Sequence, residues 1–125
     1  MTRSERISDF LHLGEVMHQP AFQEMLASRA QLHNGWFLPS NTIYAIRAVL
    51  PWLTGESLGS WLNAYPEPAS SRTIGVVAAG NIPMACFHDF LSVLVAGHSL
   101  DLKLSSQDDQ IIPQIFKALC TINPD

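Results

Sequence analysis

Three short motifs between Gly80 and Ser106 hold the residues best suited to bind a ligand or assist a reaction. They are GNIP at 80–83, AGH at 96–98 and KLSS at 103–106. An asparagine beside a helix start is most often a cap, and a lysine at a strand end is most often solvated. The G-x-G-x-x-G fingerprint of dinucleotide binding is missing. The function of these motifs therefore depends on where the surrounding elements place them.

The elements around the motifs are predicted to be strand, helix, strand and helix. Residues 73–78 (TIGVVA) form an apolar, β-branched run, typical of a strand covered on both faces of a parallel sheet. Residues 99–104 (SLDLKL) alternate polar and apolar side chains, which indicates a second strand. Between them, Pro83 suits the first turn of a helix that runs to about Ala96 and stops at Gly97.

The last helix is expected over 106–120, where Asp108 and Asp109 suit its positive N-terminus and Pro113 should distort its second turn. Strand, helix, strand and helix in this order begin a right-handed, doubly wound, Rossmann-like α/β domain. The loops after two parallel strands lie at one edge of the sheet, where such domains bind ligands. The chain ends where a third strand should begin, so we expect this domain to be truncated.

The part of the chain before this domain is predicted to be helical. Residues 1–66 contain short amphipathic helices, and a Pro- and Ala-rich loop then leads to the α/β domain at 72–125. The helices are expected to end or kink at Gly14, Asn34-Gly35, Pro51 and Pro66. The predicted fold class is therefore α/β, with N-terminal amphipathic helices followed by an incomplete cofactor domain.

Composition excludes several classes of function. The net charge is -4 with only 7 Lys and Arg, which are scattered, so a nucleic-acid surface is not expected. No stretch approaches the roughly 20 apolar residues of a membrane span, and residues 1–9 lack a signal-peptide core. Two cysteines without a spaced framework indicate a cytoplasmic protein. A hydrophobic fraction of 47% indicates a chain that packs against more protein, and we expect a homo-oligomer.

The sequence GVVAAGNIP…VAGHSLDLKLSS resembles the aldehyde dehydrogenase pattern of strand, Asn-aromatic-Pro, helix, Ala-Gly-Asn, strand and Lys-Pro-Ser. A closer resemblance is to the LuxC-like acyl-CoA reductases, bacterial enzymes of that superfamily that make fatty aldehyde. It rests on GNIPMACFHDFLSVLVAGHSLDLKLSSQD, NGWFLPSNTIYAIRAV and LGSWLNAYP. The resemblance covers nearly the whole chain and is densest from Ile74 to Gln107.

This resemblance implies the N-terminal cofactor-binding portion of an NADPH-dependent acyl-thioester reductase. In such enzymes a cysteine attacks an acyl-CoA or acyl-carrier thioester, and the bound acyl group then accepts hydride from NADPH. The family's cysteine lies well beyond position 125, so the catalytic domain is expected to be absent from this chain. The remainder of the same enzyme would then be its partner. The alternative is a stand-alone nucleotide-binding or protein-interaction module without catalysis.

The resemblance also assigns roles to the first motif. Asn81 matches the asparagine whose amide holds the thioester oxygen as it becomes negative, a task suited to a neutral, fixed donor. Its alternative role is that of a helix cap. Ala78, Ala79 and Gly80 would line the cofactor with backbone, and their small size leaves room for it. The alternative is a simple tight turn between strand and helix.

The third motif is assigned to the cofactor. Lys103 matches the lysine that reaches the adenosine ribose and the phosphate of NADP, and its alternative is an ordinary solvated lysine. The family's acidic residue after this motif is missing here. An acid would bind ribose hydroxyls and repel a 2′-phosphate, whereas Ser105 and Ser106 can donate hydrogen bonds to one. The resemblance therefore implies NADP rather than NAD.

The remaining reactive residues are given structural roles. His88 and Asp89 are neighbours on a helix, which point in different directions, so packing or an interface is favoured over acid–base catalysis. Cys86 and Cys120 are predicted to be small buried hydrophobic residues. No metal site is predicted, because metal-ligand spacing is missing around the other histidines, which are His12, His18, His33 and His98.

Overall fold

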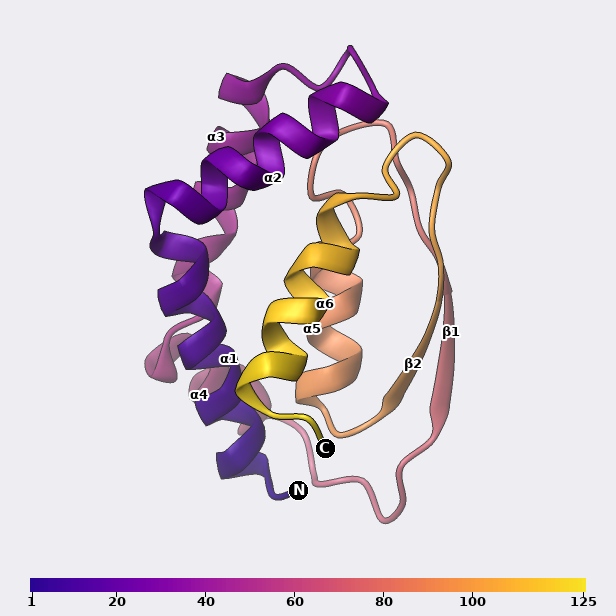
Figure 1. Cartoon of the computed structure of the whole chain (residues 1–125). Coiled ribbons are helices and arrows are strands. Elements are labelled where there is room, and N and C mark those ends of the chain that lie inside the picture. The colour runs from indigo at the N-terminus through magenta and orange to yellow at the C-terminus, as the bar shows by residue number, and fades with distance from the viewer.

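A computed structural model describes residues 1–125 as a mixed α/β fold, with six α-helices, one 3-10 helix and two parallel strands (Figure 1). The helices are α1 (Arg3–His18), α2 (Pro20–His33), α3 (Pro39–Val49), η1 (Leu50–Trp52), α4 (Gly55–Leu62), α5 (Phe87–Val95) and α6 (Ile111–Ile122). The strands are β1 (Thr73–Val77) and β2 (Ser99–Lys103). The predicted α/β class and the order of elements are confirmed.

Helix α1 begins with a capping box. The Glu5 N–H donates to Thr2 Oγ1 at 3.3 Å, and the Thr2 N–H donates to Glu5 Oε2 at 2.6 Å. The helix then continues through Gly14, so the predicted stop at this residue is wrong. A Cβ on Gly14 would lie 3.1 Å from Leu53 Cβ, and this close packing explains a glycine inside a helix.

The next helices end largely where their breaking residues predict. Helix α2 ends before Asn34, whose N–H donates to Ala30 O at 2.8 Å. At Pro51 the helix α3 gives way to the 3-10 helix η1, as expected of a residue without an N–H. Helix α4 ends at Leu62, earlier than the predicted end at Pro66.

The sheet has one open face. Strands β1 and β2 pair in parallel register, with Thr73 opposite Ser99 and Val77 opposite Lys103. Alternate residues of both strands are exposed, and Val77 is 86% exposed. The prediction that β1 is covered on both faces is therefore wrong for this chain. Helices cover one face of the sheet only, so an apolar, β-branched run does not by itself show that both faces of a strand are covered.

Helix α5 connects the two strands and starts later than predicted. Pro83 lies in a turn before the helix, in which Met84 has a φ of 66°, and the helix begins at Phe87. Its predicted stop at Gly97 is confirmed. Gly97 has a φ of 96°, and the His98 N–H donates to Val93 O at 3.1 Å, which forms a Schellman motif.

Helix α6 also starts later than the expected position 106. Residues 104–110 form a loop, and the Ile111 N–H donates to Asp108 Oδ1 at 3.4 Å where the helix begins. Pro113 therefore sits in the first turn, where its missing N–H costs nothing, so the predicted distortion does not occur.

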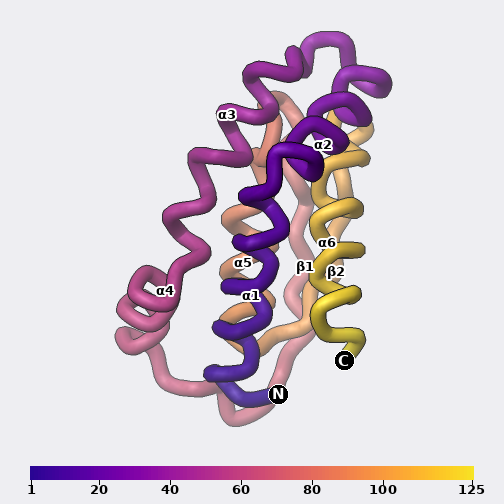
Figure 2. Tube along the Cα trace, turned by 60° about the vertical axis from the view of Figure 1, so that its left-hand side comes forward, coloured from indigo at the N-terminus to yellow at the C-terminus, as the bar shows by residue number.

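The elements form three layers, with the sheet on one side, α5 and α6 in the middle, and α1 to α4 on the other side (Figure 1). Viewed after a turn of 60°, α1 runs alongside both α5 and α6 (Figure 2). One hydrophobic cluster joins residues of both predicted segments, among them Phe10, Leu13, Leu58, Phe87, Phe90 and Ile111. The segments 1–66 and 72–125 therefore share one core.

Candidate functional site

The loops that follow β1 and β2 lie against each other at the carboxyl edge of the sheet. The Ala78 N–H donates to Lys103 O at 2.9 Å, which extends the pairing beyond β1. Gly80 is buried, and a Cβ built on it would overlap the Cβ and Oγ of Ser105. The sequence motifs GNIP and KLSS are therefore brought together, as the parallel arrangement predicts.

Asn81 lies exposed in a bend between β1 and α5, and its amide makes no hydrogen bond within the chain. The N-cap of α5 is Cys86, which has no side-chain cap. The alternative in which Asn81 caps the helix is therefore wrong. Its amide remains available to a ligand at this edge.

The residues assigned to the cofactor differ in exposure. Ala79, Lys103 and Ser106 are exposed, and Lys103 Nζ donates to Leu104 O at 3.2 Å. Ser105 is half-buried, and its Oγ accepts a hydrogen bond from the Gln107 N–H at 3.2 Å. The Ser105 hydroxyl can therefore still donate a hydrogen bond to another acceptor. The edge thus presents one cation and two hydroxyls beside exposed backbone.

Asp108 is a buried carboxyl beneath these loops, and sequence reasoning considered it only as a helix N-terminal charge. Its side chain accepts from the Ile111 N–H, and its own N–H donates to Ser105 O at 3.1 Å. Burial raises the pKa of Asp108, although backbone hydrogen bonds from Ile111 and Gln110 oppose the rise. Asp108 therefore joins the second loop to α6.

The two cysteines differ in their exposure to solvent. Cys86 is buried, and its burial, together with the nearby Asp108 and Asp89 carboxylates, raises its pKa to about 11. It is a thiol at neutral pH, unsuited to nucleophilic attack, as its prediction as a buried hydrophobic residue implies. Cys120 is exposed on α6, so the same prediction is wrong for it. His88 is exposed, with its ring edge-on to Trp52 at 5.7 Å.

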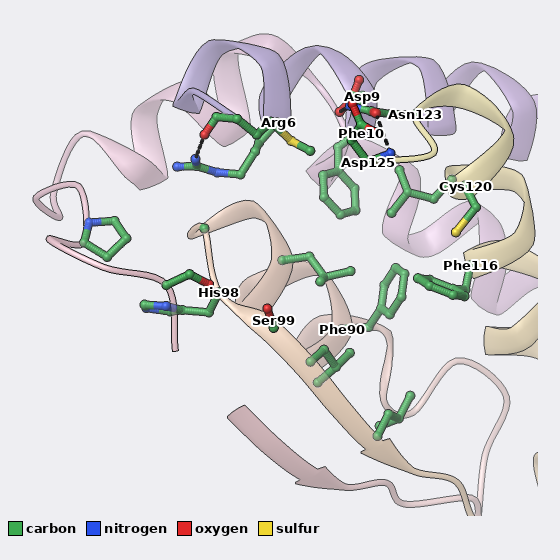
Figure 3. Close-up of a pocket in the computed structure, with 18 of the residues that line it drawn as sticks. Arg6, Asp9, Phe10, Phe90, His98, Ser99, Phe116, Cys120, Asn123 and Asp125 are labelled. Atoms are coloured by element: carbon green, nitrogen blue, oxygen red, sulfur yellow. Dashed lines mark hydrogen bonds between the residues drawn. The ribbon is translucent and has the colours of Figure 1, made fainter. Parts of the chain in front are cut away.

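A cavity of about 890 Å³ lies elsewhere, between β2, α5 and α6 (Figure 3). Its lining includes none of the seven predicted site residues, which are Ala78, Ala79, Gly80, Asn81, Lys103, Ser105 and Ser106. The apolar residues Phe90, Leu102 and Phe116 line it, and Gly97, His98 and Ser99 reach it at the start of β2. Sequence reasoning missed this cavity, because periodicity does not reveal the gap between a strand and a helix.

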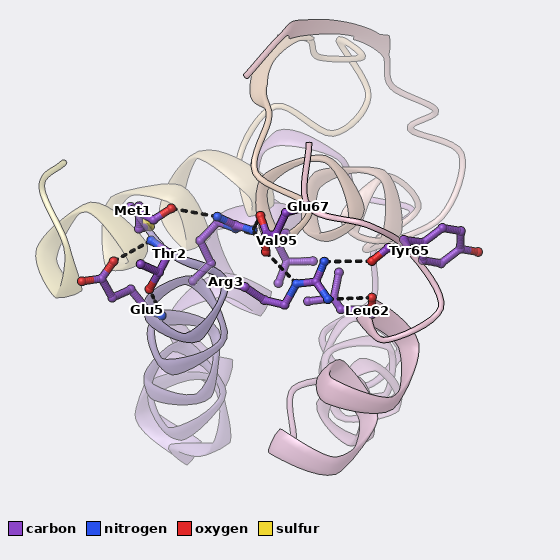
Figure 4. A network of polar contacts seen from close by, with 9 residues as sticks. Met1, Thr2, Arg3, Glu5, Leu62, Tyr65, Glu67 and Val95 are labelled. Carbon is purple, nitrogen blue, oxygen red and sulfur yellow. Dashed lines mark hydrogen bonds and ion pairs between the residues drawn. The ribbon is translucent and has the colours of Figure 1, made fainter. Parts of the chain in front are cut away.

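An ion-pair network (Figure 4) lies beside that cavity, which Arg6 and Glu67 help to line. Arg6 donates from Nη2 to both carboxylate oxygens of Glu67, at 3.0 and 2.9 Å, and from Nε to Val95 O at 2.9 Å. Arg3 donates to the same carboxylate and to the Leu62 and Tyr65 carbonyls. The network fixes the segment after α4 against α1 and the end of α5.

Comparisons with known proteins found no match among protein-family models, curated proteins or solved structures. No group of three or more His, Cys, Asp or Glu side chains is placed to hold a metal ion. None of the helices has the length and apolar character needed to cross a membrane. The candidate site is thus defined by the carboxyl edge of the sheet, with Asn81 on one loop and Lys103 at the end of β2.

Proposed function

We propose that this chain is the N-terminal, NADPH-binding portion of a cytoplasmic bacterial acyl-thioester reductase of the LuxC-like type, within the aldehyde dehydrogenase superfamily. Its substrate would be an acyl-CoA or an acyl-carrier thioester, and its product a fatty aldehyde. The nucleophilic cysteine would lie outside residues 1–125, since Cys86 is a buried thiol and Cys120 lies on the far part of α6. The α/β part would be the start of a Rossmann-like cofactor domain.

The observation that carries this proposal is the contact between Gly80 and Ser105. It joins the loop of the asparagine to the loop of the lysine, so a single ligand could meet both. A parallel strand pair that ends in two such loops is the usual place for a nucleotide in an α/β sheet. The resemblance of residues 74–107 to the family supports the same assignment.

The roles of the residues follow from their chemistry. NADPH would supply hydride, while Lys103, Ser105 and Ser106 would bind the adenosine ribose and its 2′-phosphate. The exposed backbone of Ala79 lets the cofactor come close to the sheet edge. Asn81 would donate a hydrogen bond to the thioester oxygen as negative charge develops on it. Because the Asn81 amide has no partner in the chain, it need not break a bond to do so.

NADPH binding to the chain tests the cofactor assignment. Lys103→Ala should weaken NADPH binding about 10-fold, since a charge-assisted contact to phosphate is lost. Ser106→Glu should weaken NADPH binding while sparing NADH, because an acid repels only the 2′-phosphate. Lys117→Ala, an exposed lysine on α6, is the matched control and should change neither affinity. Equal NADPH and NADH affinities in all four proteins would contradict the assignment.

The oxyanion role is tested in the intact reductase by single-turnover release of CoA without NADPH. Asn81→Ala should slow this acylation by about 10²–10³-fold and leave NADPH affinity unchanged. Lys103→Ala should show the reverse pattern, because the two side chains act on different ligands. Normal acylation by Asn81→Ala would overturn the assignment. Failure of both arms, with no NADPH binding, would favour a protein-interaction module.

A further inference from the structure

A second pocket, of about 510 Å³, opens in the helical layer of the molecule. Its lining residues are His18 of α1, Gln23 of α2, Arg47 of α3, Leu50 and Pro51 of η1, and Thr54 before α4. These elements lie on the far side of α5 and α6 from the strands (Figure 1). The pocket is therefore separate from the polar loops at the sheet edge, and a further strand beside β2 would lie in a different layer.

The guanidinium of Arg47 is held at one nitrogen and free at the other two. Its Nε donates to Gln23 Oε1 at 3.1 Å, and the same glutamine donates from Nε2 to Met17 O at 2.8 Å. Gln23 is only 2% exposed, so both ends of its amide are fixed by these bonds. Neither Nη1 nor Nη2 of Arg47 makes a hydrogen bond or an ion pair within the chain. A buried glutamine thus orients an exposed cation whose terminal nitrogens form a fork suited to two oxygens of an anion.

The rest of the lining also favours an anion. No Asp or Glu lines the pocket, and the exposed His18 adds a nitrogen donor from a different helix. Free carbonyls at the end of α1 would repel an anion. Two of them are occupied, because Val16 O accepts from the Gln19 N–H at 3.1 Å and Met17 O accepts from Gln23. The pocket therefore presents two donor side chains without a competing carboxylate.

The number of donors favours a phosphate monoester over a carboxylate. A carboxylate has two oxygens, which the Arg47 fork alone would satisfy. A phosphate monoester has three terminal oxygens, so the third is available to His18. The pocket volume falls within the range of about 300–1,000 Å³ that is usual for small-molecule sites, which leaves room for the esterified group. None of the lining residues is an exposed large hydrophobic side chain, which a site at a membrane surface would need.

We propose that this pocket binds the phosphate group of a small, soluble phosphate monoester. Arg47 and His18 bind the phosphate oxygens, and Gln23 positions Arg47. The site goes beyond the proposed reductase function, because it lies apart from the loops assigned to NADPH and does not depend on that cofactor.

The test titrates the whole chain with phenyl phosphate and with benzoate. Calorimetry gives the affinities, and the NMR signals of the Arg47 Nε–H and the His18 ring show where each probe binds. Phenyl phosphate should shift both signals and bind about 10-fold more tightly than benzoate, because a further charge-assisted contact is made. Arg47→Ala should weaken phenyl phosphate binding about 10-fold, and Arg47→Lys nearly as much, since lysine keeps the charge but not the fork. His18→Ala should weaken it about 3-fold, the cost of one hydrogen bond.

Arg29→Ala is the matched control, because Arg29 is an exposed arginine of α2 outside the pocket, and it should change the affinity less than about 2-fold. Gln23→Met tests the positioning role. It should weaken phenyl phosphate binding about 3-fold, and adding Arg47→Ala to it should cost less than Arg47→Ala costs alone, because the two residues act together.

Several results would overturn the proposal. Equal losses in Arg29→Ala and Arg47→Ala would indicate general charge attraction, and equal affinities for benzoate and phenyl phosphate would exclude a phosphate site. Loss of binding in Lys103→Ala would place the phosphate at the sheet edge. Tighter binding to vesicles that contain phosphatidic acid would identify a membrane surface as the ligand. Unchanged affinity in Arg47→Ala, together with a lower melting temperature, would show that Arg47 only links α2 to α3.

Discussion

Gly80 and Ser105 determine how the two polar loops meet at the sheet edge. The absence of a Cβ at Gly80 is expected from sequence to leave room for a cofactor, and the structure shows a second reason for a glycine there. The position that a Cβ would take at residue 80 is occupied by Ser105. A glycine is thus required there by a neighbouring loop, whether or not a nucleotide binds.

Gly80→Ala should therefore lower the free energy of unfolding by about 1–3 kcal/mol, the usual cost of overpacking a close contact. Denaturant unfolding measures the change. Gly59→Ala in α4 is the matched control, because a Cβ there meets nothing within 4 Å. It should raise stability by roughly 0.5–1 kcal/mol, as expected for glycine in a helix. Adding Ser105→Gly to Gly80→Ala should recover most of the loss, and no recovery would contradict the contact.

Asp108 should make stability fall as pH rises. Burial raises its pKa in the folded chain above the ordinary value of 3.8, so the folded state holds this proton more tightly than the unfolded state. The associated stability is fully present below pH 3.8 and is lost as pH rises through the higher folded-state value. Asp108→Asn keeps an acceptor for the Ile111 N–H and removes the charge.

Urea unfolding from pH 4 to pH 8 tests this prediction. The quantity compared is the free energy of unfolding of Asp108→Asn minus that of the natural chain. As pH rises, the variant should become more stable relative to the natural chain. Asp101→Asn, at an exposed residue of β2, removes a charge without removing a buried carboxyl and is the matched control. A difference that is constant across the range would contradict a raised pKa.

Among the elements, the strands were predictable from sequence and several helix boundaries were not. Both strands lie within one residue of their predicted ends, because β-branched and alternating patterns are local signals. Helices α5 and α6 begin later than the sequence predicts, at Phe87 and Ile111. The turn after Pro83 buries Met84 in the shared core, and the loop before Asp108 contacts Gly80 and accepts a hydrogen bond from Asn34 at Gln107 O. Hydrophobic periodicity does not reveal such contacts.

The candidate site, too, was predictable from sequence only in part. That GNIP and KLSS meet at one edge followed from the parallel strands. The exposure of Asn81 did not follow, because a cap and an unpaired amide have the same sequence signature. Asp108 was visible only as an acid before a helix. The cavity beside β2 depends on where α6 packs, which no pattern in residues 99–122 specifies.

The segment after α4 is held by the network of Arg3, Arg6 and Glu67. Hydrogen bonds from Arg6, and then from Arg3, hold the pKa of Glu67 below its usual value. Glu67→Gln leaves Arg6, whose side chain is 9% exposed, without a charged partner. The segment should then detach more often, and trypsin should cut after the exposed Arg72 several-fold faster.

Glu24→Gln, at an exposed residue of α2 without an ion pair, is the matched control for this digestion and should leave the rate unchanged. Digestion in high salt separates the ion pairs from packing, because salt screens exposed charges. If Glu67→Gln is cut at the natural rate, the segment is held by packing alone.

The sheet of this chain borders two different surroundings. Polar loops gather at the carboxyl edge, while β2 also borders the largely apolar cavity between it, α5 and α6. Both features depend on the core that the helical and α/β segments share.

The distribution of thiols across the molecule leads to a last prediction, that residues 1–125 alone do not reduce acyl-CoA with NADPH. Cys86 is buried with a pKa of about 11, and Cys120 lines the cavity between β2, α5 and α6, whose lining does not include Lys103. An acyl-enzyme needs a thiolate beside both the cofactor and an oxyanion donor. Oxidation of NADPH that depends on acyl-CoA, followed by absorbance, should therefore match the rate without protein. The variant Cys86→Ala/Cys120→Ala should give the same background, whereas activity that this variant loses would show that the chain carries its own nucleophile.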